Sequence, residues 1–154
     1  MSLVLDKFFF KSLSTDTTIA SITDGRIFNT GRATKDDNED KVPYIIITFE
    51  GLANDVDTKD CSYESDDDKV LISIMCVAST REELAQLTEA VRIRNREFAE
   101  LARGGAVEVD EVPIDWNFSA DKIQYDYTKP CYYQTLNYEC ECENINDVNY
   151  DKEN

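Results

Sequence analysis

Two runs of apolar residues limit what this chain can fold into. The stretches "PYIIITF" (43–49) and "KVLISIMCVAS" (69–79) carry apolar side chains on both of the faces that a strand presents. A strand that is apolar on both faces is typical of the centre of a sheet that is covered on both sides. We therefore expect two adjacent central strands, with Ile47 and Ile74 buried in the core.

The segment after the second run predicts a long helix that covers this sheet. Ser79 and Thr80 are each followed three residues later by a glutamate, Glu82 or Glu83, which is the spacing of a capping box. Gly104 and Gly105 supply a stop. Between these signals, apolar residues fall on one narrow arc of a helical wheel, and we expect this arc to pack on the strands. The arc consists of Leu84, Leu87, Val91, Phe98 and Ala102.

The N-terminal part of the chain predicts a second helix before the strands. Apolar residues at three- and four-residue spacing indicate an amphipathic helix at 3–13, and a short helical turn is expected at 15–22. Asp24 and Gly25 form a stop-and-turn pair. Residues 26–30 are a short strand candidate.

Strand candidates in the C-terminal third complete the predicted sheet. Residues 131–142 alternate between an apolar and a polar face, as in a strand buried on one side, while 106–116 and 122–127 are weaker candidates. The expected fold class is α+β, with a small mixed or antiparallel sheet of about four or five strands, an N-terminal helix and one long helix packed on it. The length of 154 residues suits one domain, 1–143, followed by an acidic C-terminal tail, 144–154.

The acidic composition narrows the range of partners. Asp and Glu number 32 against 16 Lys and Arg, so the formal net charge is −16. Such an excess repels anionic membranes and argues against ordinary nucleic-acid binding through phosphates. The apolar stretches fall short of the roughly 18 residues that a membrane span needs. The five cysteines are odd in number, and we expect them to be reduced thiols of an intracellular protein.

Residue types that usually carry catalysis are scarce. The chain has no histidine, which removes the usual general base and the commonest metal ligand. Asp36, Asn38 and Asp40 have calcium-loop spacing, but Lys41 and Ile47 occupy the positions that require glycine and glutamate. A solvated loop is therefore the better interpretation of this run.

The cysteines of the last strand candidate are the other potential metal ligands. Cys140 and Cys142 could supply two thiolates, but the chain has no CxxC pair to complete a zinc site. Two cysteines on the inward face of a strand are more typical of small core residues. We therefore expect no enzymatic activity, no catalytic residues, no cofactor and no bound metal.

The outer side of the long helix carries an apolar residue among arginines. Ile93 lies nearly opposite the covering arc, with Arg92, Arg94 and Arg96 around it. One interpretation is an exposed residue with no role, beside arginines that pair with glutamates of the same helix. The other is a candidate subunit interface, at which the arginines meet an acidic loop of a neighbour.

Three stretches of the first two thirds of the chain resemble a known family. They are "GRIF" (25–28), "PYIIITF" (43–49) and the strand-to-helix run from Val70 to Arg92. Together they are similar to the tail terminator proteins of long-tailed bacteriophages and prophages, which are also called tail-completion or head–tail joining proteins. The C-terminal third lies outside this resemblance.

The resemblance implies a structural virion protein located in the tail or neck. Proteins of this family form a ring, typically six-fold, at the head-proximal end of the tail tube. The implied partners are further copies of the chain, the tail-tube protein and the head connector protein, with assembly in the bacterial cytoplasm and no membrane. DNA would pass nearby without specific binding, which agrees with the acidity.

Within such a ring, the two acidic loops at 31–42 and 54–68 are candidate contact or lumen-lining surfaces. They are long for simple connections between strands. Their candidate residues are Asp36, Asp37, Glu39, Asp40, Asp66, Asp67 and Asp68. Two alternatives stay open: an acidic DNA mimic that inhibits a host nucleic-acid-binding enzyme, and another structural protein of the neck, connector or scaffold.

Overall fold

The computed structural model of the chain describes residues 2–29, 41–54 and 67–143. After a short 3-10 turn at Ser2–Val4, the described residues form three α-helices and six strands. In chain order these are α1 (Leu5–Ser14), α2 (Thr17–Thr23), β1 (Ile27–Asn29), β2 (Tyr44–Ala53), β3 (Asp67–Ala78), α3 (Arg81–Arg103), β4 (Asp115–Ala120), β5 (Gln124–Asp126) and β6 (Cys131–Glu143).

All six strands of the described residues belong to one mixed sheet. Its order is β1-β2-β3-β6-β4, and β5 pairs with the first part of β6. The β1–β2 pair is parallel, and the other pairs are antiparallel. The predicted α+β class is confirmed, with more strands than expected because β4 and β5 both pair with β6.

The long helix begins and ends where its signals predict. The Thr80 side chain accepts a hydrogen bond from the Glu83 backbone N–H at 3.1 Å, and the Glu83 carboxylate accepts one from the Ser79 N–H at 3.2 Å. These bonds satisfy backbone donors that the first turn of a helix leaves unpaired. Gly104 is the C-cap, and Gly105 then adopts a φ of 77°, which favours glycine.

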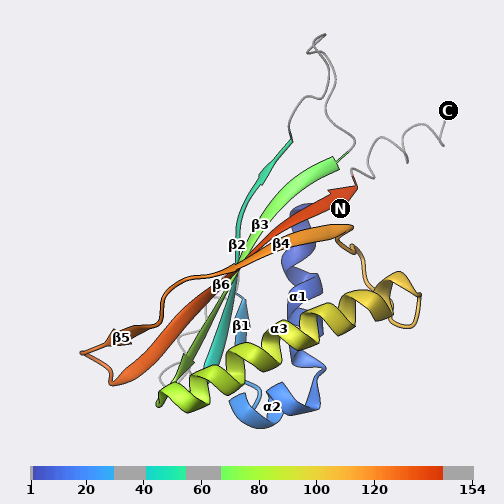
Figure 1. Cartoon of the computed structure of the whole chain (residues 1–154). Helices are drawn as coiled ribbons and strands as arrows, with labels where there is room; N and C mark the ends of the chain where they lie inside the picture. Colours follow the sequence, from blue (N-terminus) through green and yellow to red (C-terminus); the bar gives the residue numbers. More distant parts are fainter. Residues whose placement is uncertain (1, 30–40, 55–66, 144–154) are drawn as a thin grey trace, which may run out of the picture.

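Helices α1 and α3 pack on the same face of the sheet. Figure 1 shows α3 crossing the strands obliquely, with α1 and α2 near β1. The ring of Phe9 in α1 lies 5.1 Å from that of Tyr138 in β6, and Phe8 lies 5.3 Å from Phe98 in α3. The predicted arc is confirmed, since Leu84, Leu87, Val91 and Phe98 are buried and Ala102 packs against the core.

The two central strands have one buried face and one partly open face. Ile45 and Ile47 are fully buried beneath the helices, whereas Ile46 and Met75 on the opposite face are only half-buried. In the ranges that the structure describes, no helix packs on that opposite face. The expectation of cover on both sides therefore holds for one face, and cross-strand neighbours provide partial cover on the other.

Of the two weak strand candidates, the first was placed inaccurately and the second is confirmed. Residues 106–114 are irregular, and the strand β4 starts only at Asp115. The alternation that suggested a strand arises because Val107, Val109 and Val112 pack against the core without pairing to a neighbour. The second candidate, 122–127, contains the short strand β5.

Strand β6 confirms the strongest prediction for the C-terminal third. It runs from Cys131 to Glu143 between β3 and β4. Leu136, Tyr138 and Cys140 on its inner face are buried, while Glu139 on the other face is exposed. The predicted tail, 144–154, lies outside the described residues.

We expect Ile47→Ala to lower the free energy of unfolding by about 2–5 kcal/mol, because it removes buried methyl groups from the core. Ile47 lies directly opposite Ile74 in the β2–β3 register, and both side chains are fully buried. Ile46→Ala, one residue away on the open face, is the matched control and should cost clearly less. Urea unfolding followed by circular dichroism measures both, and equal losses would contradict the assignment of the two faces.

Candidate interaction surfaces

A buried chain of hydrogen bonds joins α1, α3 and β6. The Ser12 hydroxyl donates to Asn95 Oδ1 at 2.9 Å, and Asn95 Nδ2 donates to the Tyr138 hydroxyl at 3.1 Å. All three residues are almost completely buried. Burial raises the pKa of Tyr138 to about 12, with the hydrogen bond from Asn95 as a smaller opposing effect. Asn95 continues the covering arc one turn after Val91, which is the signal that sequence reasoning overlooked.

The arginines of the candidate interface lie on different flanks of α3. The Arg92 guanidinium lies over the ring of Phe118 in β4, 4.2 Å from its centroid. Arg94 points the other way and donates from Nε to the Ser12 carbonyl at 2.8 Å and from Nη2 to the Thr15 hydroxyl at 3.1 Å. Arg94 thus tethers α3 to the α1–α2 connection.

Ile93 and Arg96 remain on the outer surface of α3. Ile93 is 40% exposed, and Arg96 is exposed as well. Arg94 forms an ion pair with Asp16 at 3.9 Å, so its partner is the N-cap of α2 rather than a glutamate of α3. The interface role of these four residues stays a prediction, and Arg92, Ile93 and Arg96 are its exposed members.

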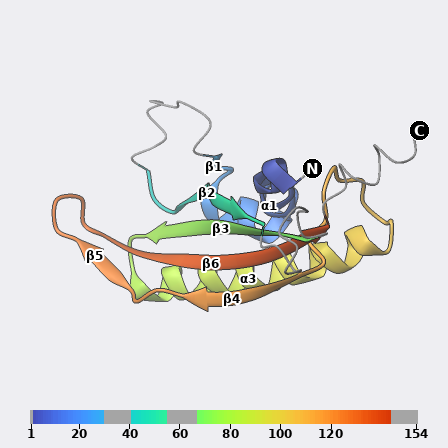
Figure 2. The ribbon, with the colours of Figure 1, turned by 90° about the horizontal axis from the view of Figure 1, so that it is seen from above.

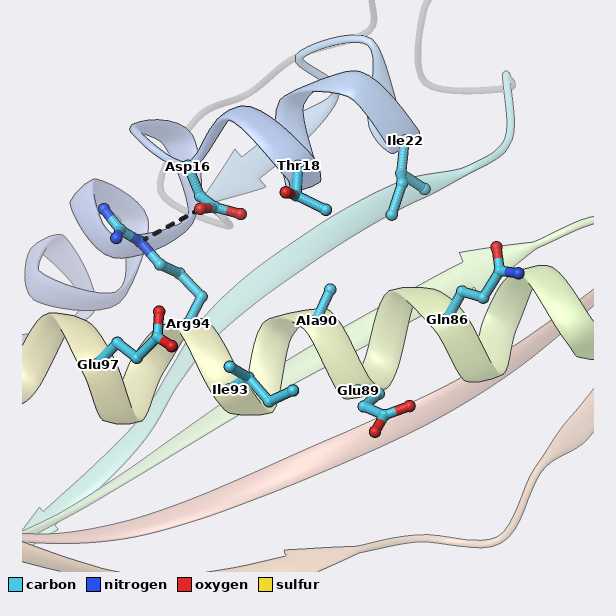
Figure 3. A pocket seen from close by; sticks show the side chains of 9 residues that line it. All are labelled: Asp16, Thr18, Ile22, Gln86, Glu89, Ala90, Ile93, Arg94 and Glu97. Carbon is cyan, nitrogen blue, oxygen red and sulfur yellow. Dashed lines mark ion pairs between the residues drawn. The ribbon is translucent and has the colours of Figure 1, made fainter.

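A groove of about 450 Å³ lies between α2 and α3, next to Ile93. Figure 3 shows Ile22 of α2 and Ala90 of α3 facing each other across it, with Arg94 reaching Asp16 at one end and Gln86 at the other. The apolar side chains of Ile22, Ala90 and Ile93 give it a mainly apolar lining.

Carboxylates surround this apolar lining. Asp16, Glu89 and Glu97 all contribute to the walls, and Arg94 is the one cation among the lining residues. Asp16 also caps α2, because its carboxylate accepts a hydrogen bond from the Ile19 N–H at 3.1 Å. The groove is therefore an apolar strip with an acidic rim.

The hairpin formed by β5 and the start of β6 is the second prominent surface. Both views show it projecting beyond the N-terminal end of α3 (Figures 1 and 2). Three tyrosine rings meet edge to face along it: the Tyr125 ring centroid lies 4.9 Å from that of Tyr127 and 4.9 Å from that of Tyr132. Tyr127, in the turn, is 88% exposed. The sequence predicts both of its strands, a weak candidate at 122–127 and a stronger one at 131–142, but not that the hairpin projects.

The hairpin turn is held by a single carboxylate. Asp126 accepts hydrogen bonds from the Thr128 N–H at 2.9 Å and the Thr128 hydroxyl at 2.7 Å. These bonds favour the charged form and lower the pKa of the Asp126 carboxyl below its ordinary value. The turn that carries Tyr127 therefore has a defined local structure.

The acidic loop candidates are only partly within the described residues. Asp36, Asp37, Glu39, Asp40 and Asp66 lie outside them. Asp67 and Asp68 belong to strand β3, and the prediction that they lie in a loop is wrong.

These two aspartates belong to the strand because β6 is long enough to pair with them. Asp67 lies opposite Glu143 and Asp68 opposite Cys142. Asp68 is only 8% exposed, and its carboxylate accepts a hydrogen bond from Asn54 Nδ2 at 2.7 Å. Asp68 is thus held inside the fold rather than displayed on a contact loop.

Four thiols are buried in the described part of the chain. Burial raises the pKa of Cys76, Cys131, Cys140 and Cys142, and that of Cys142 reaches about 12. High pKa values keep these thiols protonated, and the thiolate is the form that binds metals. Among the residues that the structure describes, no three potential ligands gather to hold a metal ion, and no helix is long and apolar enough to span a membrane.

Comparison with known proteins gives a likeness of fold. No family model and no curated protein matches the sequence. A chain in the solved structure described as "Virion of native gene transfer agent (GTA) particle" is similar to this one, with a TM-score of 0.57 and 13% sequence identity. The match covers 90% of this chain and 94% of the virion chain. The protein therefore shares, over nearly its whole length, the fold of a chain from a virion.

We expect Asn95→Leu to lower the free energy of unfolding by about 1–3 kcal/mol for each buried partner that it leaves unsatisfied. The partners are the hydroxyls of Ser12 and Tyr138. In a Ser12→Ala, Tyr138→Phe background the same substitution should cost much less, because both polar partners are gone. Urea unfolding of wild type and the three variants measures this coupling, and an equal cost in both backgrounds would contradict the network.

The buried thiols predict a loss of stability at alkaline pH. A thiol that stays protonated in the folded state but ionises near its ordinary pKa of 9.0 when unfolded makes the unfolded state more favourable as pH rises. The free energy of unfolding should fall from about pH 9 upward, and Tyr138 should add to the fall above its ordinary value of 10.0.

Substituting Cys140→Ser and Cys142→Ser together tests this effect, because serine does not titrate in this range. The double variant should lose less stability than wild type between about pH 8 and about pH 11 under reducing conditions. Identical slopes of stability against pH for the two proteins would rule out a contribution from these thiols.

Proposed function

We propose that this protein is a non-catalytic structural component of a tailed-phage-like particle, and that it forms a ring at the head-proximal end of the tail. The observation that carries the proposal is the likeness of fold to a chain of the gene transfer agent virion, which spans 90% of this protein. The resemblance of residues 25–28, 43–49 and 70–92 to tail terminator proteins supports the more specific assignment to the end of the tail.

The charge of the chain suits a particle through which DNA passes. With a net charge of −16, the subunits repel phosphate groups, so DNA can move past the ring without binding to it. The same charge works against assembly, because the subunits also repel one another. Each contact between subunits therefore needs apolar area or a local match of opposite charges.

The proposed partners are further copies of this chain, the tail-tube protein and the head connector protein. The family resemblance favours six-fold symmetry and assembly in the bacterial cytoplasm. The described residues offer surfaces of the required kind: an apolar groove, a projecting aromatic hairpin and a partly open sheet face. Such features support a binding role rather than a catalytic one.

We expect the wild-type protein to cap purified tail tubes and to co-purify with tail-tube and connector proteins. Arg92→Glu combined with Arg96→Glu should abolish capping while the circular dichroism spectrum stays that of a folded protein. The reason is that both side chains are exposed on α3 and would now repel an acidic neighbour. Electron microscopy of tubes mixed with each variant measures capping.

Arg81→Glu, at the first residue of α3, controls for added negative charge elsewhere on the same helix. If the double variant caps tubes as wild type does, this flank of α3 is not the interface. If wild type associates with neither tubes nor connectors, the ring function fails, and the DNA-mimic alternative becomes the leading hypothesis. Binding to a basic host protein would then be the next measurement.

A further inference from the structure

We propose that the tip of the β5–β6 hairpin of one copy of this chain docks into the groove between α2 and α3 of a second copy. In the proposed ring, this is the contact between neighbouring subunits. That the contact closes into a ring rests on the proposed function. In this contact Tyr127, the most exposed large apolar side chain of the described residues, would enter the apolar groove beside Ile93.

The hairpin has the shape and chemistry of an inserted element. It projects past the end of α3, away from the helical layer of its own chain (Figures 1 and 2). Exposed apolar area gathers on it, since Tyr127 is 88% exposed and Ile123 and Tyr125 are each 38% exposed. Rigid, partly apolar tyrosines are typical anchors of protein interfaces, because they bury a large area at a small cost in side-chain entropy.

The groove is a suitable receptor for such a side chain. Its volume of about 450 Å³ is enough for an aromatic ring, and its lining from Ile22, Ala90 and Ile93 is apolar. Ile93 is 40% exposed, so docking would remove apolar area from water on both partners. The Arg94–Asp16 ion pair at one end holds α2 and α3 together, so the groove is already formed before docking.

The net charge of the hairpin permits its approach to the acidic rim of the groove. The groove presents Glu89 and Glu97 on its rim. The hairpin segment 121–130 contains two lysines and two aspartates, so it is neutral within a chain of net charge −16. Asp126 accepts a hydrogen bond from Thr128 and has Lys129 nearby, and Asp121 accepts one from Asn137 Nδ2 at 2.9 Å. Both lysines are exposed, and Lys122 is the group best suited to meet the acidic rim.

A contact between two different patches leads to a ring. The hairpin and the groove are distinct surfaces of one chain, so each subunit that inserts its hairpin also offers a vacant groove to the next subunit. A head-to-tail contact of this kind propagates until the rotation between subunits closes it. The second copy of this chain is thus the occupant that fits both the shape and the charge of the groove.

Zero-length cross-linking tests the contact directly. A carbodiimide joins a lysine to a carboxylate only when they touch, so a mixture of ¹⁴N- and ¹⁵N-labelled protein distinguishes links between chains from links within one. We expect mixed-isotope links from Lys122 or Lys129 to Glu89 or Glu97, both in concentrated purified protein and in particles that contain it. Their absence from both samples would overturn the proposal.

Two surface variants and one control test whether the groove and the hairpin form the contact that gives the cross-links between chains. Tyr127→Ser and Ile93→Asp should each reduce the yield of these links by about tenfold or more, as expected for an anchor in the centre of an interface. Leu101→Asp makes the same change elsewhere on α3, at a side chain of nearly equal exposure (42% against 40%), and should leave the yield unchanged. Unchanged yields in both test variants would also overturn the proposal.

The outcomes separate this contact from the function itself. If wild type and both variants cap tail tubes equally well and the links are absent, the ring function stands and a different surface joins the subunits. If the links form in purified protein but the protein never associates with tubes or connectors, the self-contact stands and the tail-end function fails.

Discussion

The fold depends on one buried amide. Asn95 joins Ser12 and Tyr138, which lie 83 and 43 residues away in sequence, and so ties α1, α3 and β6 at one point. Tyr138 is also the centre of an aromatic cluster, with the rings of Phe9, Trp116 and Phe118 each about 5 Å from its own. A buried polar group of this kind tolerates few arrangements, because any shift that breaks its bonds leaves unsatisfied groups in the core.

The orientation of α3 fixes the surfaces around it. With Asn95 facing the sheet, Arg92 is directed to Phe118 at one side and Arg94 to the α1–α2 connection at the other. Ile93 is then left facing outward, where it contributes to the lining of the groove. The interior contacts of the helix and its outward surface are therefore consequences of the same rotation about the helix axis.

Local sequence patterns predicted the helices and strands of this fold better than they predicted the contacts between them. The boundaries of α3 followed from Thr80, Glu83 and the two glycines, because caps and stops act within a few residues. The separation of Arg92 from Arg94 also follows from about 100° of rotation per residue, although the prediction grouped them. The sequence predicted a loop at Asp67 and Asp68. They belong to strand β3 because β6 is long enough to pair with them, which the local sequence does not reveal. The groove has no sequence signal, because it depends on segments that meet only in three dimensions. Both strands of the hairpin were candidates, but the sequence did not indicate that the hairpin projects from the fold.

The position of β6 has a consequence for synthesis of the chain. This strand follows all the others in sequence, yet it lies between β3 and β4 in the sheet. Until Cys131–Glu143 has left the ribosome, β3 carries an unpaired edge and α1 and α3 lack the Tyr138 side of their core. An unpaired apolar edge is the feature that promotes association with other chains. We therefore expect a nascent chain that stops before this strand to associate with other chains rather than to form a smaller domain.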